Sequence, residues 1–81
     1  MSECIVHRRG RLRALAETLS AIPSVVATDL VDDADGDDVL VLEVVAQGEV
    51  LPARAVERIG NARCGVGSVQ RQGDCVVGVV R

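Results

Sequence analysis

Four arginines stand close together near the start of the chain and are its strongest candidates for binding chemistry. They lie in residues 8–13, whose sequence is RRGRLR, at the point where a helical pattern begins. Helix N-termini carry partial positive charge, so cations there are unfavourable unless an anion compensates them. Free backbone amides, a glycine that permits close approach and forked guanidinium groups together suit a carboxylate or a phosphate. We therefore predict a small anionic ligand at Arg9, Gly10, Arg11 and Leu12.

Two other interpretations of this basic segment stay open. One is a solvated basic turn that neighbouring Asp residues neutralise. The other is weak nucleic-acid binding through residues 8–13, but the formal net charge of the chain is −3 and it has no aromatic residue on which a base could stack. The composition therefore argues against nucleic acid as a partner.

The acidic segment at residues 32–38, DDADGDD, invites comparison with a calcium-binding loop. An EF-hand loop with its glycine at Gly36 would need an acidic ligand at position 31 and a glutamate at position 42. Val31 and Leu42 stand there instead, so both ends of the cage are missing. We interpret this segment as a solvated loop between two strands.

Three cysteines and the single histidine could in principle bind zinc. Cys4 and His7 are three residues apart, and on a strand such residues point to opposite faces. Pairing of the last two strands as a hairpin places Cys64 and Cys75 about six residue rows apart, roughly 20 Å, too far for a disulfide or a shared metal. No motif places a nucleophile beside a base or two groups for acid–base work. We expect no metal, no cofactor and no enzymatic activity.

Length and composition favour one small domain over residues 1–81. A chain of 81 residues buries only about 60–65% of its unfolded surface, and this one must fill its core without Phe, Tyr or Trp. No apolar run approaches the length of a membrane span, and arginines interrupt the region where a signal peptide would lie. An odd number of cysteines then suggests free thiols in the reducing cytoplasm.

Apolar spacing and turn residues predict two tandem units, each made of a helix followed by two strands. The first unit has a helix over residues 11–22, ended by Pro23, and strands over 25–31 and 39–46. The second has a helix from about residue 51 to 59, ending at Gly60 or Asn61, and strands over 64–70 and 75–80. A further short strand over residues 4–7 would make the fold a ferredoxin-like βαββαβ sandwich with an extra C-terminal strand. Its antiparallel sheet would carry both helices on one face.

Two of these strands are apolar on both faces, which bears on assembly. A sheet with helices on one side and water on the other should alternate apolar and polar residues, but residues 39–42 (VLVL) and 76–80 (VVGVV) do not. We therefore predict a homodimer, formed by sheets packing face to face or by pairing of edge strands. A small domain that leaves a few valines exposed is the alternative.

From residue 5 to residue 69 the chain resembles ACT domains, ferredoxin-like regulatory modules that bind amino acids or related small molecules, usually as dimers. The resemblance is carried by Gly10-Arg11-Leu12, Ile22-Pro23-Ser24-Val25, the strand over residues 39–45 and Val56-Glu57-Arg58-Ile59. In that family the turn before the first helix, often Asp-x-Pro-Gly-x-Leu, helps form the ligand site. Here His7 and Arg9 stand at the Asp and Pro positions. Residues 19–25, LSAIPSV, are also similar to ligand-binding domains of Lrp-like regulators and to small maturation chaperones of nitrate reductases.

Together these features predict a dimeric regulatory module that binds a small anionic metabolite or an amino acid. The alternative is a protein-interaction or chaperone-like module that holds a peptide on a sheet face or at an edge strand.

Overall fold

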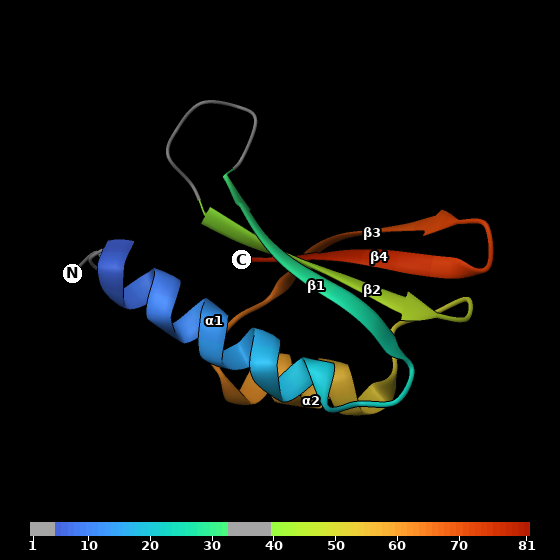
Figure 1. The fold of residues 1–81 in the computed structure, drawn as a ribbon, viewed down its shortest axis with the longest axis horizontal. Helices are drawn as coiled ribbons and strands as arrows, with labels where there is room; N and C mark the ends of the chain where they lie inside the picture. The colour runs from blue at the N-terminus through green and yellow to red at the C-terminus, as the bar shows by residue number, and fades with distance from the viewer. Residues whose placement is uncertain (1–4, 33–39) are drawn as a thin grey trace.

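The fold consists of two consecutive units of one helix and two strands (Figure 1). The computed structural model describes the backbone of residues 5–32 and 40–81, and the side chains of residues 9–31 and 40–81. The first unit contains α1 (Ile5–Ser20), β1 (Val25–Asp32) and β2 (Leu40–Gln47). The second contains α2 (Ala53–Asn61), β3 (Val66–Gln72) and β4 (Cys75–Val80). The predicted tandem αββ arrangement is therefore confirmed.

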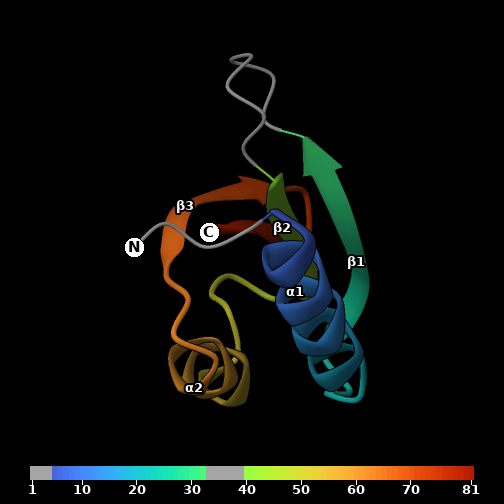
Figure 2. The ribbon, with the colours of Figure 1, turned by 90° about the vertical axis from the view of Figure 1, so that its left-hand side faces the viewer.

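All four strands form one antiparallel sheet in the order β1-β2-β4-β3. Each unit contributes one hairpin, and the hairpins join where β2 pairs with β4, for example at Leu42 with Val80. Both helices lie on the same side of the sheet, α1 near β1 and β2 and α2 below β3 (Figure 2). The sheet therefore has a helix side and an open side.

The expected strand over residues 4–7 is wrong for residues 5–7, because α1 already begins at Ile5; Cys4 lies outside the described residues. No proline stands between Ile5 and Ser20, and Gly10 is the only strong helix-weakening residue there. One glycine inside a helix costs only about 1 kcal/mol, so Gly10 does not prevent a helix that begins six residues earlier than expected. The sheet order also leaves no place for a first strand between β2 and β3, because β4 lies there.

The first helix also ends slightly earlier than expected, at Ser20. The amide nitrogens of Ala21 and Ile22 donate to the carbonyl oxygens of Thr18 and Leu19 at 3.3 and 3.0 Å, which closes a final tighter turn before Pro23. The chain then turns directly into β1, whose first residue Val25 donates its amide to Ile22.

The core is aliphatic and lies between the helices and the sheet. Apolar residues one helical turn apart on α1 pack against the helix side of β2 and against α2. The buried residues of this core cluster are Leu12, Leu15 and Leu19 of α1, Leu40, Leu42 and Val44 of β2, Ala55 and Ile59 of α2, and Val80 of β4. On β4, Gly78 has no side chain and Leu51 occupies the space above it, since a Cβ at Gly78 would lie 2.9 Å from Leu51 Cδ1. Leu51, which is half-buried, thus packs over β4 just before the start of α2.

The β3–β4 hairpin turns tightly at Gly73 and Asp74, between the paired residues Gln72 and Cys75. Gly73 has φ 61°, and it occupies the first of the two central positions. A glycine with positive φ at this position is typical of type II′ turns, whose twist matches that of the flanking strands. The predicted hairpin is confirmed, with β3 running two residues further toward the turn than expected.

Candidate functional site

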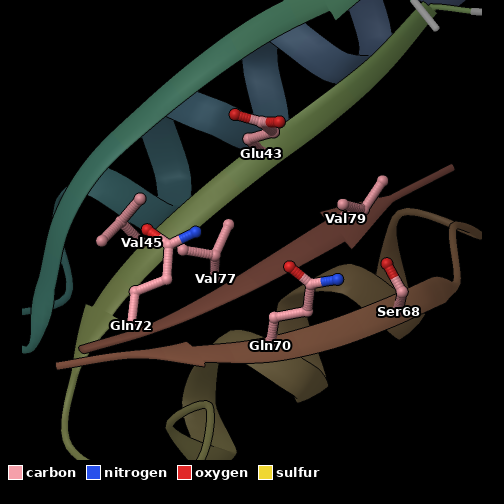
Figure 3. A pocket seen from close by; sticks show the side chains of 7 residues that line it. All are labelled: Glu43, Val45, Ser68, Gln70, Gln72, Val77 and Val79. Atoms are coloured by element: carbon pink, nitrogen blue, oxygen red, sulfur yellow. The ribbon is translucent and has the colours of Figure 1, made fainter. Parts of the chain in front are cut away.

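The open side of the sheet contains a shallow depression of about 240 Å3 in the part of the molecule that neither helix covers (Figure 3). Its residues come from three neighbouring strands: Glu43 and Val45 of β2, Val77 and Val79 of β4, and Ser68, Gln70 and Gln72 of β3. Figure 3 shows all seven side chains standing on the same side of the sheet.

Strand alternation explains why these side chains share one side. On β4, Val76 and Val80 point toward the helices and are fully buried, so Val77 and Val79 between them point the other way. The register then aligns rows across the sheet: Val77 pairs with Val45 on β2 and with Gln70 on β3. The site is therefore built by pairing of β4 with both of its neighbours.

The second row of the site runs across all four strands. Val79 pairs with Glu43 on one side and with Ser68 on the other. Glu43 in turn pairs with Asp29 of β1. Asp29 belongs to the open side because its neighbour Thr28 lies on the helix side, where its hydroxyl is 3.3 Å from that of Ser20 on α1.

The chemistry of the open side is divided between its two edges. Asp29 and Glu43 place two carboxylates beside each other near β1, and these groups accept hydrogen bonds when ionised. Gln70 and Gln72 place carboxamides, which both donate and accept, near β3. Between them Val45, Val77 and Val79 are half-buried. An apolar centre with a polar rim suits non-covalent recognition of a surface.

The residues of the predicted anion site lie within α1. Because the helix begins at Ile5, the amides of Gly10, Arg11 and Leu12 fall inside its hydrogen-bonded ladder, and they are not the free amides expected at a helix start. Leu12 is 1% exposed and belongs to the core. Arg9 and Gly10 are exposed and Arg11 is half-buried. The structure therefore does not gather these four residues around free amides.

Arg11 instead lines a depression of about 290 Å3 between the two helices. The polar residues that share it are Thr18 of α1 and Arg58 and Asn61 of α2. The Thr18 hydroxyl donates to the carbonyl oxygen of Ala14 at 3.1 Å. Sequence reasoning identified Arg11 but not Arg58, because only the packing of α1 against α2 brings the two arginines to one depression.

The cysteines of the described chain are separate. Cys64 precedes β3 and its Sγ lies 3.6 Å from the carbonyl oxygen of Ala62, whereas Cys75 stands beside the turn at the far end of the hairpin. Both are free thiols. The expected separation of these cysteines assumed a hairpin in which Arg71 pairs with Asp74 and Cys64 with Arg81. That register is wrong, because Gln72 pairs with Cys75 and Gly65 with Arg81. Within residues 9–31 and 40–81, no group of three or more His, Cys, Asp or Glu side chains could hold a metal ion.

Sequence reasoning missed the polar side of β3. The signal was present, because Ser68, Gln70 and Gln72 alternate with Val69 and Arg71 at the period of a strand.

None of the described helices is long and apolar enough to cross a membrane. No family model, curated protein or solved structure matches this chain. The fold and site define it as an α+β domain with a four-stranded antiparallel sheet and one open sheet side.

Proposed function

We propose that this protein is a homodimeric binding module that assembles through the open side of its sheet. The observation that carries this proposal is the apolar centre formed by Val45, Val77 and Val79, which no described helix covers. Exposed apolar surface rimmed by polar side chains is typical of an interaction surface. A second copy of the chain is the partner we propose, because it is always present at the concentration of the protein itself.

The two edges of the open side are complementary when two copies stack around a two-fold axis parallel to the strands. That operation places β1 of one copy over β3 of the other. The carboxylates of Asp29 and Glu43 then face the side with Ser68 and Gln70, whose hydroxyl and carboxamide groups can donate to them. Like charges are kept apart in this arrangement, because the acidic edges lie on opposite sides of the axis.

The size of the sheet sets the strength of this dimer. Four strands about 4.8 Å apart and about six residues long cover roughly 400 Å2 of plane per copy. Stable interfaces bury about 800 Å2 of accessible surface per partner, so the open side alone falls in the lower part of the range. We therefore expect a dimer with a dissociation constant in the micromolar range.

Light scattering after size exclusion, over a range of protein concentrations, tests the assembly. The wild-type chain is expected to form a dimer whose proportion rises with concentration, and Val77→Glu is expected to be monomeric. Val26→Glu is the control, because it introduces the same charge at a valine of β1 that is 61% exposed and is not among the residues of the open-side depression. A wild-type monomer at all concentrations would contradict the proposal, as would a Val77→Glu dimer of unchanged affinity.

We further infer that the fold is a ferredoxin-like arrangement with one strand displaced along the chain. In that arrangement the first strand lies between the third and the last strands of the sheet. Here β4 occupies the corresponding position between β2 and β3, and it is antiparallel to both. The split β2-α2-β3 connection around β4 supports this inference.

Binding of a small anion in a regulatory role, as the ACT resemblance implies, is a second candidate function. The observation that favours it is the presence of Arg11 and Arg58 at one depression together with Asn61. Guanidinium groups suit carboxylates and phosphates because their donors form a fork. Leu12 would not contact such a ligand, since its side chain lies in the core.

Thermal unfolding in the presence of millimolar phosphate, phosphorylated metabolites or amino acids tests this second function. A ligand that binds the folded state raises the melting temperature in a concentration-dependent way. The rise is expected to be lost in Arg58→Ala and retained in Arg54→Ala, which removes an arginine of the same helix that does not line the depression. No rise with any of these anions would remove anion binding and leave the dimer proposal unaffected.

A further inference from the structure

A second surface, distinct from the open side, gathers most of the exposed apolar side chains of the molecule. Of the five large hydrophobic residues exposed in the described chain, four line one groove of about 370 Å3: Val50 at 74%, Val56 at 50%, Val66 at 37% and Val69 at 49%. Leu51 and Glu49 complete its lining. We call this the α2–β3 groove; it lies on the helix side of the sheet.

The groove adjoins an edge of the sheet. β3 is the last strand in the sheet order and pairs only with β4, so the backbone groups on its outer side have no strand partner among the described residues. An edge next to a groove formed with a helix can accept one more strand, whose backbone pairs with β3 and whose alternate side chains enter the groove. Affinity then comes from main-chain hydrogen bonds and specificity from the groove.

The two faces of β3 determine the pattern of residues such a strand would need. On the helix side Val66 and Val69 line the groove, whereas on the open side Ser68 and Gln70 are polar. Neighbouring side chains on one face of a sheet pack against each other. A strand added beside β3 is therefore expected to alternate apolar residues, toward the groove, with polar residues, toward the open side.

The charge of the region around β3 indicates which polar residues the added strand would carry. Residues 62–73, which contain all of β3, include two arginines and no acidic residue. Residues 50–81 as a whole contain five arginines and two acidic residues, a formal charge of +3, against −6 for residues 1–49 with four arginines and ten acidic residues. Arg71 of β3 is paired with Glu49 at 3.7 Å, and Arg63 precedes the strand by three residues. The Arg81 side chain also lies beside β3, since a Cβ at Gly67 would be 3.4 Å from its Nε. This edge therefore favours an acidic partner.

The geometry points to the α2–β3 groove as a binding site for an extended acidic segment of another protein, with apolar residues at alternate positions, which adds to the sheet beside β3. A second copy of the chain is disfavoured as the occupant, because pairing of β3 with its own counterpart would bring together two segments of formal charge +3. The site is independent of the open side, so it adds a heterologous partner to the proposed homodimer.

Binding of designed peptides tests this site on the full-length protein. The probe is a fluorescently labelled, end-capped peptide of eight residues in which Glu alternates with Val, and its anisotropy is measured during titration. We expect saturable binding that weakens with added salt. Replacing each Glu of the peptide by Lys is expected to weaken binding at least tenfold. N-methylation of every second peptide amide is expected to weaken binding by a similar factor, because it removes the N–H groups that donate to β3.

Two matched variants locate the site. Val69→Ser removes an apolar group from the α2–β3 groove and is expected to weaken probe binding at least tenfold. Val26→Ser removes an exposed valine from the other edge strand, β1, and is expected to change it less than twofold. Circular dichroism of both variants checks that they remain folded. Because Val69 is exposed, neither substitution should unfold the chain.

Three results would overturn the inference. One is the absence of saturable binding at millimolar probe; the second is equal binding by the wild type and Val69→Ser, or by the N-methylated probe. The third is loss of self-association in Val69→Ser without any peptide binding, which would make a second copy the occupant of the groove. Since the open-side dimer is tested at Val77, failure of one proposal is distinguishable from failure of the other.

Discussion

Replacing Gly10 by alanine tests where the first helix begins. Gly10 is the sixth residue of α1 as observed, it is exposed, and a Cβ added there would meet no atom within 4 Å. An alanine in a helix interior is more favourable than glycine by about 0.8–1.0 kcal/mol. Gly10→Ala is therefore expected to raise the free energy of unfolding by nearly that amount. For a domain of this size, 1 kcal/mol corresponds to a melting temperature about 4–8 °C higher.

The opposite sign is expected if the helix begins near Arg11, as the apolar spacing alone indicates. Gly10 would then cap the helix, and at that position alanine is clearly worse than glycine. Urea denaturation followed by circular dichroism at one fixed protein concentration measures the difference, since dimer formation would otherwise shift the midpoint. Gly60→Ala is the control, because Gly60 lies in α2, is exposed and has equally open surroundings. Stabilisation by Gly60→Ala together with destabilisation by Gly10→Ala would refute a helix that starts at Ile5.

Three further substitutions probe the packing and the hairpin by the same measurement. Leu42→Ala removes a side chain that is 0% exposed and is expected to cost about 2–5 kcal/mol, whereas Val26→Ala at an exposed site should cost less than about 0.5 kcal/mol; similar costs would mean that the core is misplaced. Gly73→Ala forces a side chain onto a residue with φ 61° and is expected to cost about 1–2 kcal/mol; a neutral effect would argue against this turn. Gly78→Ala puts a methyl group 2.9 Å from Leu51 Cδ1, and overpacking of this kind costs about 1–3 kcal/mol. That cost should shrink in a Leu51→Ala background, and a cost that stays the same would exclude the contact as its cause.

Local patterns were sufficient to predict most of the elements. Helical spacing of Leu12, Leu15 and Leu19 identified α1, and these three side chains are buried in the core. Pro23 correctly separated α1 from β1. The turn residues at 71–74 indicated the final hairpin, and β4 begins at Cys75 as expected, although the turn itself lies one residue later than the expected pairing of Arg71 with Asp74. Each of these signals depends on residues close together in the sequence, which is why it could be interpreted without the fold.

The strand order and the start of α1 depend on tertiary contacts, and the sequence was a weaker guide there. The short apolar run before His7 is compatible with a strand or with a helix. In the structure α1 begins at Ile5, and β4 occupies the place between β2 and β3 that a first strand would need. Apolar residues on both faces of β2 and β4 indicated a covered open side. β2 and β4 are the two central strands of the sheet. The side chains around Val45 and Val77 therefore half-bury them, although no second layer of described residues covers this side.

The candidate sites also combine features that local sequence patterns reveal with features that depend on tertiary contacts. Arg11 could be recognised from its neighbours in the sequence, but its proximity to Arg58 depends on how the helices pack. The α2–β3 groove combines Val56 of a helix with Val66 and Val69 of a strand, and none of these residues is unusual by itself. Surfaces assembled from separate elements cannot be predicted from local spacing.

The seam between β2 and β4 also determines how the chain can be divided. Each half has one helix and one hairpin, and a two-stranded hairpin is only marginally stable in water. Only the pairing of β2 with β4, between residues as distant in sequence as Leu42 and Val80, makes a four-stranded sheet. A cut in the linker around Gly48 and Glu49 would therefore yield two fragments that are unstructured apart and fold when mixed. Folding of either fragment would therefore indicate that the two fragments have bound each other.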